Sequence, residues 1–213
     1  MIAKLLLEAT LDTLYMTFVS TFLAFIIGLG LAIILVITGK NGLKPNKAIY
    51  NALDIIVNTL RSFPFIILII VLFPFTKFIV GTSIGTTAAI VPLTIGSAPF
   101  IARLIENAMN EVDHGIIEAA LSYGATKTQI IFKVIFIEAL PSIINAITLT
   151  LIVVIGFTAM AGAVGGGGLG DVAMRYGFQR FRLDIMAYTV IILIAMVQII
   201  QSSGNFLYKI TKK

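Results

Sequence analysis

Four long windows without a charged side chain constrain this chain more than any other feature. They cover residues 13–39, 78–102, 139–170 and 185–208. A helix needs about 20 mainly apolar residues to cross the hydrocarbon layer of a membrane, and each window is longer than that. Residues 55–76 form a fifth apolar segment, which only Arg61 interrupts. These runs are too long for the strands of a membrane barrel and do not alternate, so the sequence predicts membrane-spanning helices.

We therefore expect an all-α integral membrane protein, with residues 1–213 forming a single transmembrane domain. The five predicted spans cover residues 13–39, 52–76, 80–103, 139–164 and 185–208. A removable signal peptide is the alternative for the first span, since Lys4 resembles a short basic region ahead of it. The apolar run is longer than the core of a signal peptide and four more spans follow, which favours a retained helix.

The composition excludes the common soluble classes. Apolar residues make up 59% of the chain and charged residues only 12%, against about 25% charged in soluble domains. An ordinary soluble enzyme, a disordered chain and a nucleic-acid-binding module are therefore excluded. There is no cysteine and a single histidine, His114, so we expect no thiolate or multi-histidine metal site.

The distribution of Lys and Arg predicts the orientation. With the N-terminus outside, nine of the 15 basic residues lie in cytoplasmic segments and five lie outside, Arg61 being within the second span. Cytoplasmic segments normally carry the basic excess, so we expect the N-terminus outside and the C-terminus inside. Arg175, Arg180 and Arg182, which follow the fourth span, count against this orientation.

The segment between the third and fourth spans, residues 110–137, is too long and too apolar for a simple turn. Its pattern predicts two short helices, over residues 116–123 and 127–136. Gly124 suits the left-handed conformation that ends a helix. Thr126 and Gln129 have the spacing of a capping box at the start of the second helix.

Glu118, Ala119 and Ala120 place an acid beside two methyl side chains in the first of these helices. Such a surface lets the backbone of a partner come close, while a helix pair lying on lipid headgroups is the alternative. The pattern Glu118-Ala119-Ala120-x-x-x-Gly124, followed later by Leu140-Pro141, resembles the EAA loop of ABC importer permeases. The resemblance implies cytoplasmic coupling helices that dock on a separate ATPase. The residues that it assigns to this contact are Glu118, Ala119, Ala120, Gly124 and Ala125.

Longer stretches are similar to the permeases of methionine ABC importers, which are inner membrane components of binding-protein-dependent transport systems. These stretches cover residues 61–66, 80–85, 89–94, 98–103 and 159–170. The resemblance implies a type I importer fold and a multi-pass location in the bacterial inner membrane. It also implies a homodimer that imports methionine, L- and possibly D-, with two cytoplasmic ATPase subunits and an extracytoplasmic methionine-binding lipoprotein. A permease for another amino acid or betaine, and an autonomous channel, are the alternatives.

The glycine-rich stretch over residues 165–170 does not predict a nucleotide site. A P-loop requires Gly-Lys-Ser/Thr after its loop, but Asp171 and Val172 follow here. Gly165, Gly167 and Gly170 have the Gly-x-Gly-x-x-Gly spacing of a dinucleotide-binding motif, but no βαβ unit surrounds them. We expect ATP and Mg²⁺ to be bound by the partner ATPase, with no cofactor and no enzymatic activity in this chain. Consecutive glycines instead predict a break at the outer end of the fourth span, with a plain flexible loop as the alternative.

Three residues are candidates for the translocation path or its gate. Met160 is the one bulky side chain in the small-residue stretch 159–163 and is a candidate apolar gate, with a core methionine as the alternative. Gly162 lets helices approach closely. Arg61 lies within a span, where a charge costs about 2.5 to 3.5 kcal/mol. We expect Arg61 to pair with Asp54, two turns earlier, or to extend toward the inner surface, since Pro64 is predicted to kink the helix just beyond it. Lining the path is the alternative.

Overall fold

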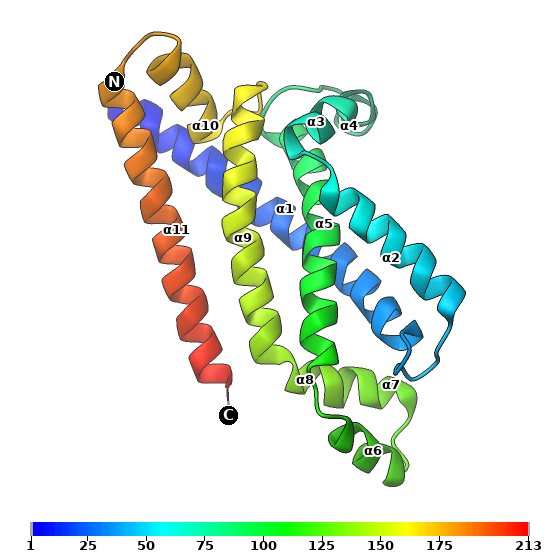
Figure 1. Ribbon diagram of the computed structural model, residues 1–213. Coiled ribbons are helices and arrows are strands. Elements are labelled where there is room, and N and C mark those ends of the chain that lie inside the picture. Colours follow the sequence, from blue (N-terminus) through cyan, green and yellow to red (C-terminus); the bar gives the residue numbers. More distant parts are fainter. Residues whose placement is uncertain (1, 213) are drawn as a thin grey trace.

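The computed structural model describes residues 2–212, and all the regular structure in that range is helical. In chain order the elements are α1 (Ile2–Thr38), α2 (Lys47–Ser62), α3 (Phe65–Val71), α4 (Phe73–Val80), α5 (Thr86–Asn110), α6 (His114–Ser122), α7 (Lys127–Gln129), the π-helix η1 (Ile130–Ile135), α8 (Phe136–Glu138), α9 (Leu140–Ala163), α10 (Gly168–Val172), the π-helix η2 (Ala173–Phe178) and α11 (Leu183–Thr211). This confirms the all-α prediction. The long helices lie side by side, with α6 and α7 at one end of the bundle (Figure 1).

Four helices, α1, α5, α9 and α11, are long and apolar enough to cross a membrane. A fifth crossing requires α2 and α3 together, and these two helices meet at an angle of 103°. The predicted second span, residues 52–76, is therefore bent, and the kink predicted at Pro64 is confirmed. Proline pushes the residue before it into extended backbone and cannot donate to the preceding turn. Phe63 accordingly has ψ of 127°, and α3 begins directly after Pro64.

The boundaries of the other spans follow the charge-free windows to different degrees. α9 and α11 nearly coincide with the predicted residues 139–164 and 185–208. α5 begins later than the predicted residue 80, because Gly81 and Gly85 have positive φ and form a turn before it. α1 begins well before the window, so the helix extends beyond the apolar segment and includes the ion pair of Lys4 and Glu8.

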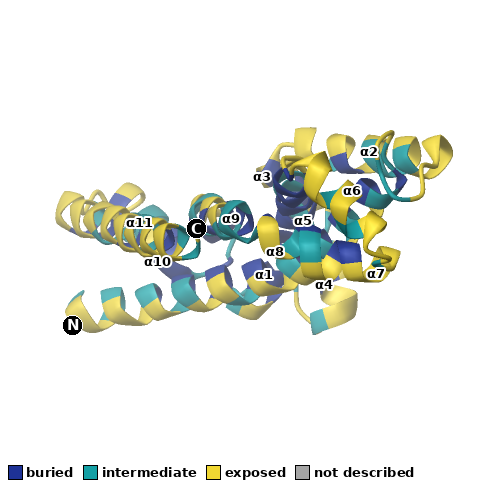
Figure 2. Ribbon diagram, turned by 90° about the horizontal axis from the view of Figure 1, so that it is seen from below, coloured by how far each residue is buried: buried dark blue, intermediate teal, exposed yellow. Residues whose placement is uncertain are grey.

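α5 is the central helix of the bundle. Of its most apolar window 67% is buried, compared with 17% for α11, and Figure 2 shows exposed residues along the outer faces of α1 and α11. α1 crosses α5 obliquely (Figure 1). A Cβ atom at Gly28 of α1 would lie 2.9 Å from the carbonyl oxygen of Ala98 on α5, so small residues allow the two backbones to come into contact.

The glycine-rich segment after α9 is a buried turn. α9 ends at Ala163, and the chain reverses through Gly165 and Gly167, which have φ of 90° and 78°. All five residues of α10 are buried. The predicted break is therefore confirmed, and the segment is not a plain exposed loop. It packs α10 back against the end of α9 and against α1.

Candidate functional site: helix α6 and a polar network between α2 and α5

The helix α6 begins at a local cap. Asp113 precedes the helix, and its carboxylate accepts a hydrogen bond of 2.6 Å from the backbone N–H of Gly115. A carboxylate at this position satisfies a donor that the helix leaves without a partner. The helix starts two residues before the predicted residue 116. Its cap lies in the short segment between the end of α5 at Asn110 and the start of α6.

The other end of α6 is a Schellman motif. The N–H of Gly124 donates to the carbonyl of Leu121 at 2.9 Å, and the N–H of Ala125 donates to the carbonyl of Ala120 at 3.0 Å. Gly124 has φ of +81°, which a residue without a Cβ adopts without strain. The predicted left-handed helix end is confirmed, and it sets the direction in which the chain leaves α6.

The second short helix starts with the predicted capping box. The backbone N–H of Thr126 donates to Oε1 of Gln129 at 2.8 Å, and the N–H of Gln129 donates to Oγ1 of Thr126 at 3.3 Å. The helix then widens into η1, where Ile130, Ile131 and Ile135 are buried among side chains of α1, α5 and α9. The α6–α7 hairpin is thus fastened to the transmembrane bundle by an apolar anchor.

The residues of the EAA-like pattern divide between two faces. Glu118, Ala119 and Gly124 are exposed. Ala120 and Ala125 are half-buried and pack against the buried cluster that includes η1. The two inward methyl groups therefore seat α6 on the bundle. The exposed residues are the candidates for a contact with a partner, and we call them the coupling surface: Glu118, Ala119 and Gly124.

Tyr123 lies beside this surface and was not singled out from the sequence. Its side chain is 93% exposed, which is unusual for a large aromatic residue in a folded chain. The signal available in the sequence was its position directly before the helix-ending glycine. An exposed aromatic side chain next to small residues is typical of an interface with another protein.

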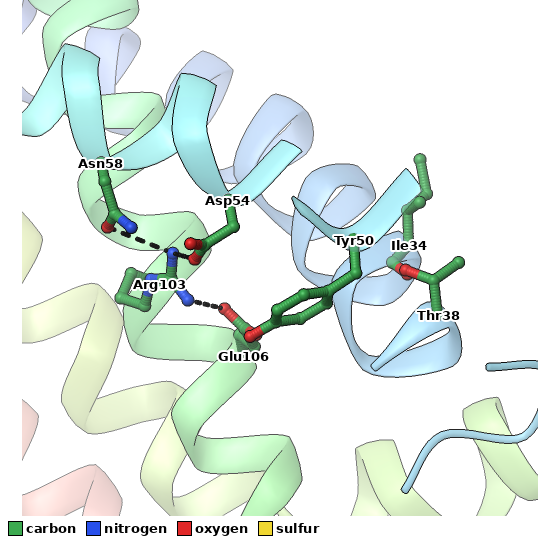
Figure 3. Close-up of polar contacts among 7 residues, drawn as sticks. All are labelled: Ile34, Thr38, Tyr50, Asp54, Asn58, Arg103 and Glu106. Carbon is green, nitrogen blue, oxygen red and sulfur yellow. Dashed lines mark hydrogen bonds and ion pairs between the residues drawn. The ribbon is translucent and has the colours of Figure 1, made fainter. Parts of the chain in front are cut away.

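A second polar site, not expected from the sequence, joins α2 to α5 (Figure 3). Arg103 of α5 forms ion pairs with Asp54 of α2 and, at 2.7 Å, with Glu106. Asn58 accepts a further bond of 3.2 Å from Arg103, and the hydroxyl of Tyr50 donates to Glu106 at 3.2 Å. We call these five residues the α2–α5 network.

The α2–α5 network corrects the partner expected for Arg61. Asp54 pairs with Arg103 rather than with Arg61. Arg61 is exposed, and no ion pair within residues 2–212 involves it. Glu106, by contrast, is only 2% exposed, and a buried carboxylate requires a partner charge. Arg103 lies within reach of both Glu106 and Asp54 and pairs with both.

The gate candidates do not form one cluster with the coupling surface. Met160 on α9 is 46% exposed. Gly162 is buried, and a Cβ there would collide with the backbone of Gly170 and Asp171 in α10. Gly162 therefore permits close packing within the chain, as its small size predicted, and its surroundings are protein backbone. Across residues 2–212, no group of three metal-ligating side chains comes together.

The family profile described as "Binding-protein-dependent transport system inner membrane component" matches residues 26–213. The chain belongs to this family. It is a multi-pass inner-membrane permease of an ABC importer, and its fold is that of the type I importer permeases, as the resemblance implied.

Individual relatives cover nearly the whole chain. The probable D-methionine transport system permease protein MetI of Vibrio cholerae is 56% identical over 97% of this chain and 92% of its own length. The methionine import system permease protein MetP of Bacillus subtilis is 48% identical over 97% and 93%. A solved structure of the MetNI methionine ABC transporter in an inward-facing conformation superposes with a TM-score of 0.97, at 45% identity over 99% of this chain and 98% of that one.

Proposed function

We propose that this chain is the membrane-spanning permease of an ATP-driven methionine importer. The proposal rests on the near-complete superposition on a permease of the MetNI transporter, together with relatives named for methionine or D-methionine import. L-methionine and D-methionine are therefore both substrates to test. Another small solute or an autonomous channel has no comparable support.

The proposed assembly contains two copies of this chain, two cytoplasmic ATPase subunits and an extracytoplasmic methionine-binding protein, surrounded by membrane lipid. In it, ATP and Mg²⁺ bind to the ATPase, and this chain carries out no bond chemistry. The proposed orientation has the N-terminus outside and the C-terminus inside, which places α6 on the cytoplasmic side. The basic excess among the cytoplasmic segments supports that orientation.

The coupling surface on α6 is the proposed contact with the ATPase. Glu118 offers a charge, while Ala119 and Gly124 leave room for a partner's backbone. The buried isoleucines of η1 attach the α6–α7 hairpin to α1, α5 and α9. A displacement of α6 driven by ATP binding would therefore move these helices as connected bodies, which is how packed elements transmit a switch.

The proposed gate involves Met160, whose side chain is exposed on α9 in the single chain. Exposure is what a residue facing a second copy across the dimer axis requires. A flexible thioether fills an irregular constriction and repacks readily. Gly162 lets α10 pack closely against this part of α9. Arg61, which is exposed in the last turn of α2, is proposed to line the translocation path.

The test is uptake by the complete complex reconstituted in proteoliposomes. ATP is enclosed in the lumen, which represents the cytoplasmic side, and the binding protein is added outside. We expect accumulation of radiolabelled methionine that requires both the binding protein and a hydrolysis-competent ATPase. Betaine and a non-sulfur amino acid serve as substrate controls. Uptake of betaine in preference to methionine would overturn the substrate, and methionine flux that persists without a functional ATPase would overturn the importer mechanism.

A further inference from the structure

A cavity of about 790 Å³ lies at the end of the bundle that carries α6. The turn between α1 and α2 forms one side of it, and the start of α6 and η1 form the other; this turn is at the lower right of Figure 1. Its inner wall is apolar and includes Leu35, Val36, Val112, Ile131 and Ile135. These side chains are buried, so the wall belongs to the core of the bundle.

The rim of the cavity is basic. Lys40 and Lys47 stand at the two ends of the α1–α2 turn, and both are exposed. None of the described residues that line the cavity is Asp or Glu. Lys47 lies in the first turn of α2, which contains no acid to offset the positive end of the helix dipole. The rim therefore carries positive charge that its own lining does not balance.

The backbone holds this rim in place. The N–H of Lys44 donates to the carbonyl of Ile37 at 3.0 Å, and the N–H of Asn46 donates to the carbonyl of Thr38 at 2.9 Å. These bonds satisfy carbonyls at the end of α1. The side chain of Asn46 in turn accepts from the first N–H groups of α2. The turn that bears the two lysines is therefore held by hydrogen bonds within the chain.

We propose that this cavity is a binding site for an anionic phospholipid. The phosphate lies at Lys40 and Lys47, and part of one acyl chain lies along the apolar wall. A cavity of this size takes a headgroup and a chain segment, in the range of sites for small molecules. A free inorganic anion would leave the apolar wall against water, and a lipid without net charge would leave the two lysines unbalanced.

The neighbouring surface supports a lipid as the occupant. Ile49 and Ile55 of α2 are 45% and 64% exposed, so the helix that begins at the cavity presents apolar side chains outward. In a membrane-spanning chain such side chains contact acyl chains. The proposal goes beyond methionine transport and depends only on the chain being embedded in a membrane.

The experiment is native mass spectrometry of the purified transporter complex with added phosphatidylglycerol or phosphatidylcholine. We expect phosphatidylglycerol to bind preferentially. Lys40→Gln and Lys47→Gln should each weaken its binding about fivefold, because a lysine near an anionic headgroup contributes about 1 kcal/mol. Lys44→Gln is the matched control, since Lys44 lies in the same turn but outside the lining. The Lys44→Gln complex should bind phosphatidylglycerol as tightly as the wild type does.

Leu43→Trp is a second variant that keeps both lysines and places a larger side chain in the cavity, which Leu43 lines. It should also weaken phosphatidylglycerol binding, with thermal unfolding confirming that the complex stays folded. An equal loss in Lys44→Gln would indicate general surface charge and overturn the site. So would equal binding of phosphatidylcholine, or displacement of the lipid by inorganic phosphate at equal concentration. Methionine uptake is not measured, so these outcomes are independent of the proposed function.

Discussion

Arg103 on α5 pairs with Asp54 on α2, 49 positions earlier in the chain, and with Glu106 on its own helix. The pairing fastens the bent α2–α3 segment to the central helix of the bundle. Glu106 is almost completely buried, and Arg103 supplies its partner charge. Asp54 and Asn58 bond to Arg103, and Tyr50 bonds to Glu106, so the α2–α5 network holds α2 against α5.

Removal of Arg103 tests this dependence. Arg103→Leu leaves Glu106 buried without its partner, and we expect a loss of about 3 to 5 kcal/mol of folding stability. The measurement is thermal unfolding of the purified complex. Arg182→Leu is the control, because Arg182 and Asp184 form an exposed pair, which typically contributes about 0 to 1 kcal/mol. Equal destabilisation by the two substitutions would contradict the structural role of Arg103.

Gly124 tests the coupling surface. Apart from its two chain neighbours, no described residue would lie within 4 Å of a Cβ at Gly124. Gly124→Leu therefore adds bulk on the outer face, with a strain of about 1 to 2 kcal/mol from its positive φ. We expect ATP hydrolysis to continue while methionine uptake falls at least tenfold. Gly81→Leu is matched in φ and in open surroundings but lies directly after α4, and it should leave coupling intact. Normal coupling in Gly124→Leu would argue against docking through α6.

Gly162 and Gly156 lie on the same helix and make a matched pair. A Cβ at Gly162 collides with the backbone of α10, whereas a Cβ at Gly156 meets nothing within 4 Å outside the neighbouring backbone of its own helix. Gly162→Ala should lower the unfolding temperature of the complex, because backbone in contact with backbone cannot yield. Gly156→Ala should raise the unfolding temperature slightly, because alanine favours a helix over glycine by up to about 1 kcal/mol. Equal effects would show that α10 does not pack as described.

Met160 tests the gate. Met160→Ala removes the one bulky side chain of its small-residue stretch, and we expect a higher methionine leak or a higher basal ATPase rate in proteoliposomes. Met160→Leu, which keeps the volume, is the control and should stay close to wild type. A sealed Met160→Ala complex with an unchanged basal rate would remove Met160 from the proposed gate.

Local chemistry made much of this structure predictable. The charge-free windows predicted the four long helices. A charged side chain within the bilayer costs free energy, so membrane-spanning segments appear as long runs without charge. Gly124 and the pair Thr126 and Gln129 predicted the ends of the short helices. In those cases the partner groups lie within a few residues, so spacing alone identifies them.

The remaining features depend on contacts between segments far apart in the chain. Pro64 predicted a kink in the second span, but the angle of 103° between α2 and α3 was visible only in the structure. From the sequence, either Arg61 or Arg103 could have paired with Asp54. The placement of α2 against α5 selected Arg103 as the partner of Asp54. The lysine-rimmed cavity exists because the α1–α2 turn lies beside α6 and η1. Periodicity and capping act over one helical turn, whereas these pairings are decided by which helix faces meet, which only the tertiary structure determines.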